Sequence, residues 1–154
     1  MDTEPHPLLQ VAFPALLRHA RTTYSAAMRR ALIEAGYDDI PGNGLYVIGA
    51  LAIGEAPLSQ IIAELRVSKQ VAGQLVDALV LRGYLDRRTD PQDRRRLTIT
   101  LTERGKAAAE TQAAARAAID AELVARIGAE KELHARQALS ALIDIRRDAE
   151  AAAG

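Results

Sequence analysis

The feature that most constrains the fold is a strand–turn–strand pattern at residues 85–102, with three consecutive arginines at its turn. Turn-forming residues such as Asp90 and Pro91 precede these arginines. We therefore predict a β-hairpin with strands at 84–88 and 97–101. This prediction rests more on the turn between the strands than on the alternation of apolar and polar residues within them. Two short helical patterns lie directly upstream. The order helix, turn, helix and basic hairpin predicts a winged helix-turn-helix, with the hairpin as its wing.

The two helices of this unit are expected at 58–65 and 69–82, joined by a turn at Arg66-Val67. Ser59 and Ser68 are candidate N-caps, because a serine hydroxyl accepts a hydrogen bond from a free amide of the first turn. Gly83 suits the left-handed residue that ends a helix. The apolar inner face of the second helix is assigned to Val71, Leu75, Val76 and Leu79.

Apolar spacing predicts further helices on both sides of this unit. An amphipathic helix is expected over 8–35, where Pro14 marks either a kink or the true start, and a buried helix over 45–53. After the wing, Thr102 is a candidate N-cap for a helix to about Ile127. A break at Gly128 and a last helix over 130–148 follow, with a frayed tail at 149–154.

These elements predict a mainly α fold with a small β-hairpin wing, in one chain without a separating linker. A winged helix-turn-helix lobe at 45–105 is flanked by dimerisation helices at 8–35 and 106–148. The chain is 49% hydrophobic, but only 3% of its residues are aromatic, and 18 of the residues at 107–154 are alanine. Because alanine side chains bury little apolar area, we expect a partner subunit to complete the core.

Composition excludes several classes of function. The chain has no cysteine, which rules out disulfides and thiolate metal sites. We find no signal peptide and no membrane-spanning apolar run, and expect a cytoplasmic protein. His6, His19 and His134 are scattered, so no metal site is expected. We also find no phosphate-binding loop, nucleophile elbow or catalytic triad, and therefore predict neither an enzyme nor a cofactor.

Charge is distributed unevenly, although the net charge is zero. Residues 66–106 carry ten basic and five acidic side chains, whereas 1–65 and 107–154 are both net acidic. A basic centre between acidic ends indicates a DNA-binding module. A charge run on a solvated surface is the alternative interpretation.

In a helix-turn-helix, the start of the second helix enters the major groove of DNA. The residues placed there are Ser68, Lys69, Gln70, Gly73 and Gln74. Glutamine can pair with adenine and lysine with guanine, so the residue types suit base recognition. Taken alone, the same residues also fit a solvated helix face.

The wing is expected to lay Arg94, Arg95 and Arg96 beside or into the adjacent minor groove, where negative potential concentrates. Asp93 is expected to form an ion pair that fixes the wing and orients one arginine. A surface loop is the alternative for the arginines alone. The order and spacing of both elements together favour DNA binding.

The chain resembles the MarR family of winged-helix transcriptional regulators. The resemblance rests on Leu58–Leu65, Val67–Lys69, Leu75–Leu79, Arg82–Leu85, Arg87–Arg95 and Leu101–Gly105, and above all on Asp93 and Arg95 followed by Thr102. It implies an obligate homodimer built from the N-terminal and last two helices, a pseudo-palindromic operator, and release by a small phenolic or anionic effector. It also implies that Arg95 enters the minor groove and that Asp93 holds it.

The sequence departs from the family pattern in two places. Arg66 stands where the family often has glycine, so the turn before the second helix is strained or altered. Gly73-Gln74 replaces a small hydroxyl residue followed by arginine, so the operator should differ from that of commoner members. The same departure supports the alternative function, a winged-helix module for protein interaction. The charged wing argues against that alternative.

In the family, an effector cleft lies between the dimer helices and the DNA-binding lobe. Candidate effector-binding residues here are His19, Tyr24, Met28, Tyr37 and Tyr46. Tyr24 and Met28 also lie on the apolar stripe of their helix, which is equally typical of core residues. No thiol switch is available to this chain.

Overall fold

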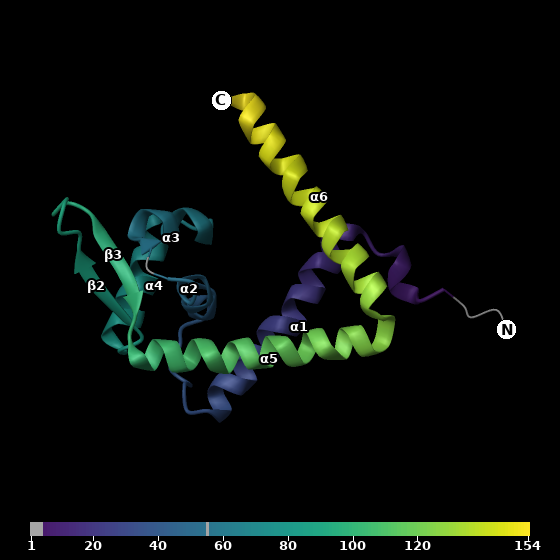
Figure 1. The fold of residues 1–154 in the computed structure, drawn as a ribbon, viewed down its shortest axis with the longest axis horizontal. Helices are drawn as coiled ribbons and strands as arrows, with labels where there is room; N and C mark the ends of the chain where they lie inside the picture. The colour runs from purple at the N-terminus through teal and green to yellow at the C-terminus, as the bar shows by residue number, and fades with distance from the viewer. Residues whose placement is uncertain (1–4, 55) are drawn as a thin grey trace. The chain divides into compact units, whose positions relative to one another are not determined.

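The computed structural model describes residues 5–54 and 56–154 (Figure 1). One compact unit extends to Arg116 and a second comprises Ala117–Gly154. The elements run in the order η1 (Pro7–Gln10), α1 (Phe13–Glu34), α2 (Gly44–Leu51), β1 (Ala56–Pro57), α3 (Leu58–Leu65), α4 (Lys69–Leu81), β2 (Leu85–Thr89), β3 (Leu97–Leu101), α5 (Glu103–Ile127) and α6 (Ala129–Ala153). The predicted mainly α fold with a hairpin wing is confirmed.

The helix ends follow the capping signals of the sequence. The Ser68 hydroxyl accepts a hydrogen bond from the Val71 amide at 3.2 Å and begins α4, as predicted. Gly83 follows α4 with φ +80°. The Thr102 hydroxyl accepts from the Gly105 amide at 3.0 Å and begins α5. Gly128, with φ +85°, separates α5 from α6.

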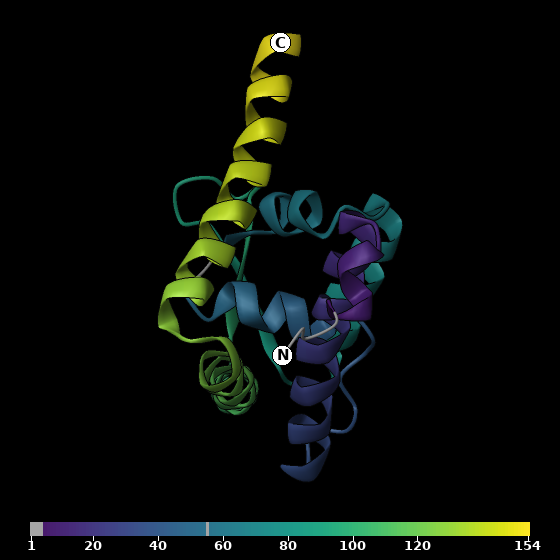
Figure 2. The same ribbon diagram turned by 90° about the vertical axis from the view of Figure 1, so that its right-hand side faces the viewer.

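Two predicted helix boundaries and one predicted cap are wrong. The helix expected over 8–35 begins only at Phe13, and of the two alternatives predicted for Pro14 the true helix start is confirmed, because Pro14 takes a first-turn position where its missing N–H costs nothing. Pro57, not Ser59, is the N-cap of α3, and no side chain among the described residues caps that helix. The last helix extends to Ala153, so residues 149–153 are helical rather than frayed (Figure 2).

The core of the first unit gathers side chains from α1, α2, α3, α4, the sheet and the start of α5. Its largest fully buried members include Leu45, Ile48, Leu79, Tyr84 and Ile99. The inner face of α4 differs from the prediction: Val71 is 49% exposed, whereas Ala72 is fully buried.

This face is formed by Ala72, Val76 and Leu79, which are spaced i, i+4 and i+7. Val71 lies one residue from Ala72, and one residue turns a helix by about 100°. Ala72 is small, so a prediction that favours large apolar side chains assigns Val71 to the core in its place.

The sheet has three antiparallel strands in the order β1-β3-β2. Arg87 is registered with Ile99 in the hairpin, and Pro57 with Thr98 on the other side of β3. The two-residue strand β1 is absent from the sequence prediction because it is too short for a periodic signal. It places the start of α3 directly beside the wing.

Candidate nucleic-acid interface

The start of α4 presents a polar surface. Lys69, Gln70 and Gln74 are exposed, and Gly73 is half-buried. Ser68 is exposed too, but its hydroxyl is engaged in the helix cap. A Cβ added at Gly73 would meet no atom within 4 Å, so this glycine leaves the helix surface open. The long polar side chains of Lys69, Gln70 and Gln74 are thus exposed and can reach the surface of a ligand.

The turn before α4 keeps the left-handed conformation. Arg66 has φ 51°, and within the described part of the chain it is the one non-glycine residue with positive φ. The expected strain is therefore confirmed, at a cost of about 1 kcal/mol relative to glycine.

The wing tip is fixed by hydrogen bonds to its own backbone. The carboxylate of Asp90 accepts from the Gln92 amide at 2.8 Å, and that of Asp93 from the Arg95 amide at 3.0 Å. The Asp90 amide donates to the Arg96 carbonyl at 3.0 Å, and the Arg96 amide to the Asp93 carbonyl at 2.9 Å. These bonds close the turn at the wing tip.

The ion pair expected for Asp93 is not formed among the residues that the structure describes. Its carboxylate holds the Arg95 backbone instead of a guanidinium, because an aspartate reaches the amide two residues on without ordering a long side chain. Arg94, Arg95 and Arg96 are consequently all exposed.

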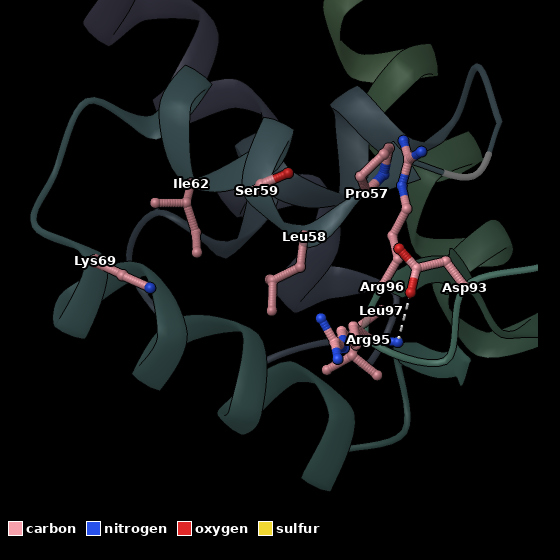
Figure 3. A pocket seen from close by; sticks show the side chains of 9 residues that line it. All are labelled: Pro57, Leu58, Ser59, Ile62, Lys69, Asp93, Arg95, Arg96 and Leu97. Carbon is pink, nitrogen blue, oxygen red and sulfur yellow. Dashed lines mark hydrogen bonds between the residues drawn. The ribbon is translucent and has the colours of Figure 1, made fainter. Parts of the chain in front are cut away.

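A cavity of about 570 Å³ lies between the wing, α3 and the start of α4 (Figure 3). We call it the wing groove; it is lined by Pro57, Leu58, Ser59, Ile62, Lys69, Asp93, Arg95, Arg96 and Leu97. Figure 3 shows Lys69 on one side and the wing residues on the other. Sequence reasoning identified Lys69, Asp93, Arg95 and Arg96 but missed the residues of β1 and α3, which only the β1–β3 pairing brings here.

The wing is also tied to α4 directly. Arg87 of β2 forms an ion pair with Asp77 of α4, and both side chains are partly exposed. Such a pair contributes about 0–1 kcal/mol to stability. Its geometric effect is to connect the two elements that carry the predicted contacts.

The candidate effector residues are spread over different environments. Met28 is buried in the core, and His19 is exposed. Tyr37 lines a cavity of about 140 Å³ and its ring meets that of Tyr84 edge-on at 6.2 Å. Tyr24 and Tyr46 are half-buried, and the Arg21 guanidinium lies 4.3 Å from the centre of the Tyr46 ring.

The described residues contain neither a metal-binding cluster nor a membrane-spanning helix. No group of three or more His, Asp or Glu side chains there is arranged to hold a metal ion. No helix within the described ranges is both long and apolar enough to cross a membrane.

Residues 38–96 match the family model described as the MarR family. This range includes the Arg66 turn, α3, α4 and the wing tip. No curated protein matches the sequence significantly.

Solved structures of low sequence identity share the fold. FabT from Streptococcus pneumoniae in complex with DNA is 18% identical, with 89% of this chain and 99% of that chain covered and a TM-score of 0.72. MepR from S. aureus in complex with DNA is 19% identical over 88% and 98%, with a TM-score of 0.71. MarR from E. coli in its apo form is 18% identical over 86% and 97%, with a TM-score of 0.66. The predicted resemblance is therefore confirmed: residues 38–96 match the model of the MarR family, and the chain shares the winged-helix fold of these solved structures.

Proposed function

We propose that the protein is a sequence-specific DNA-binding transcriptional regulator. The observation that carries this proposal is the wing groove, where Lys69 of α4 and Arg95 and Arg96 of the wing line one cavity. Phosphate neutralisation by such cations supplies most of the affinity for DNA. The exposed Gln70 and Gln74 beside them supply hydrogen-bonding groups for base edges.

In this proposal α4 enters the major groove with Ser68–Gln74, and Arg95 at the wing tip enters the adjacent minor groove. The two self-closed turns at Asp90 and Asp93 support it, because they order the wing backbone before DNA arrives. Preordering lowers the entropy cost of binding.

The regulator acts as a homodimer on a pseudo-palindromic operator, with half-site centres roughly 10 bp apart. Exposed apolar side chains support a dimer. None of the 25 residues of α6 is buried, and several of its large apolar side chains are open to solvent: Leu133, Leu139, Leu142, Ile143 and Ile145. Leu9 and Phe13 near the other end of the chain are exposed as well. Covering such faces is the driving force for association.

The regulator is further proposed to be a repressor released by a small phenolic or anionic effector. The wing groove has the volume of a small-molecule site and combines Leu58 and Ile62 with cationic side chains. An anion bound there would compete with DNA for Arg95 and Lys69. Benzoate and phenol, added to a preformed complex, test this: release by benzoate but not phenol supports a charge-driven site, and release by neither contradicts it.

The test of DNA binding is fluorescence anisotropy with a duplex from the upstream region of the protein's own gene, at two salt concentrations and against a scrambled duplex. Arg95→Ala should weaken binding and reduce the log–log salt slope by about one for each lost phosphate contact. Arg30→Ala, which removes an exposed arginine of α1, is the matched control and should leave the slope unchanged.

Unchanged affinity and slope in Arg95→Ala would exclude the wing role. Binding no tighter than to scrambled DNA would place the operator elsewhere. No binding to any duplex, even at low salt, would instead favour a protein-interaction module. The sequence feature that supports this alternative is Gly73-Gln74.

A further inference from the structure

A joint of three residues, Arg82–Tyr84, separates α4 from β2. The backbone between the proposed recognition helix and the wing therefore contains very few torsions, and each of them affects the angle between the two elements. Gly83 at its centre has φ +80° and adds no side-chain constraint of its own. Whatever fixes this joint therefore acts together with the Arg87–Asp77 ion pair on the position of Arg95 relative to Lys69.

Asp39, in the loop between α1 and α2, bonds both ends of the joint. Its carboxylate Oδ1 accepts from the buried Tyr84 hydroxyl and from Arg104 Nη2, the latter at 3.1 Å. Its backbone carbonyl accepts from the Arg82 guanidinium. The hydrogen bond from Tyr84 lowers the pKa of Asp39, with Arg104 adding to the effect, while burial and the same bond raise the pKa of Tyr84. At neutral pH the pair is thus a charged acceptor and a neutral donor.

The start of α5 holds the joint from the other side. Arg104 donates to the Arg82 carbonyl, and its guanidinium lies 4.3 Å from the centre of the Tyr84 ring. The Thr102 hydroxyl donates to the Gly83 carbonyl, and the Thr102 amide donates to the Tyr84 carbonyl at 3.1 Å. Every residue of the joint is therefore bonded to a residue outside α4 and β2. Asp39 links the joint, α5 and the α1–α2 loop.

A small rotation at this joint would displace the wing tip by a larger distance, because the wing extends away from the joint. The five residues of β2 span about 17 Å. A rotation of about 10° at the joint would move the wing tip by about 3 Å over that length. A hydrogen bond is lost over a smaller displacement than this.

We propose that Asp39 is a positioning residue for DNA binding, which sets the angle between α4 and the wing through its bonds to Tyr84, Arg82 and Arg104. The expected effect of Asp39 on DNA binding rests on the proposed function. Asp39 itself contributes negative charge and is not part of the wing groove. Its removal would therefore weaken binding by misplacing the wing, not by removing a contact to DNA.

The first test measures the geometry without DNA. Because the chain has no cysteine, Gln74→Cys and Gln92→Cys place two spin labels, one on α4 and one on the wing tip, with labelled protein diluted into unlabelled protein. Asp39→Ala should shift or broaden the distance distribution by several ångströms. Asp38→Ala removes a neighbouring exposed carboxylate and should not. Asp39→Asn keeps an oxygen acceptor for Tyr84 and should restore most of the native distribution. Equal distributions for the two alanine variants would overturn the proposal.

The second test is a double-mutant cycle on DNA, run well below the melting temperature. Asp39→Ala should weaken binding by about tenfold, the size of one lost contact, and flatten the salt slope. The loss from Arg95→Ala should then be smaller in the Asp39→Ala background, because the wing is already displaced. Strictly additive losses would contradict a positioning role. A native protein that binds no duplex would remove the proposed function, while the distance measurement would still decide whether Asp39 sets the angle.

Discussion

Gly105 is the glycine whose replacement should harm the fold most. It is buried in the first turn of α5, where an added Cβ would lie 2.1 Å from the Tyr84 carbonyl oxygen and 3.1 Å from Leu101 Cδ2. Backbone would have to move by about 1.3 Å before the first contact reached an ordinary 3.4 Å. That oxygen also accepts the Thr102 amide at 3.1 Å, so the movement would strain this bond as well.

The expected cost of Gly105→Ala follows from these contacts. Overpacking costs about 1–3 kcal/mol and the weakened hydrogen bond about 1 kcal/mol. Alanine recovers at most about 1 kcal/mol through its higher helix propensity. The net loss is about 2 kcal/mol, which lowers Tm by about 4–8 °C for a chain of this size.

Gly73→Ala is the matched control, because the same change in α4 meets nothing within 4 Å. It should stabilise the protein by about 0.5–1 kcal/mol. Thermal unfolding followed by far-UV circular dichroism measures both variants at one fixed protein concentration, since the proposed dimerisation would make Tm concentration-dependent. Gly105→Ala melting at or above the native Tm, or both variants shifting in the same direction, would refute the reasoning.

Three further predictions test other parts of the molecule. Ser68→Ala removes the hydroxyl that caps α4 and should cost about 1 kcal/mol in urea unfolding, whereas Ser59→Ala should cost less because no side chain caps α3. The folded-state pKa of Asp39 lies below its unfolded value, so its carboxylate contributes stability above about pH 4 that is lost as pH falls through the folded pKa. Asp39→Asn should therefore lose less stability than the native protein between about pH 5 and about pH 3, and parallel curves would contradict this. Ile143→Glu places a charge on the exposed apolar face of α6 and should shift the protein toward monomer in light scattering, with an unchanged mass arguing against α6 in the dimer.

The candidate interface was only partly predictable. Lys69, Arg95 and Arg96 were predicted because helix-turn-helix order and a basic turn are local patterns. The apolar wall of the wing groove was not, because Leu58 and Ile62 look like ordinary core positions of an amphipathic helix. The role of Asp93 was predicted with the wrong partner: a short carboxylate in a tight turn finds the nearest amide before it finds a guanidinium.

What the sequence determined by itself is the set of elements and their ends. Helix boundaries are marked by local interactions of four residues: Ser68, Thr102, Gly83 and Gly128. Because these interactions reach no more than a few residues along the chain, a short stretch of sequence is enough to predict them. Only the tertiary structure decided what surrounds them. The hydrogen bonds of Asp39 with Tyr84 and Arg104 join residues that are 45 and 65 positions apart in the sequence. The two residues of β1 form a strand only because they pair with β3. Contacts of that range leave no periodicity in a sequence, because they depend on where packing of the core brings separate segments together.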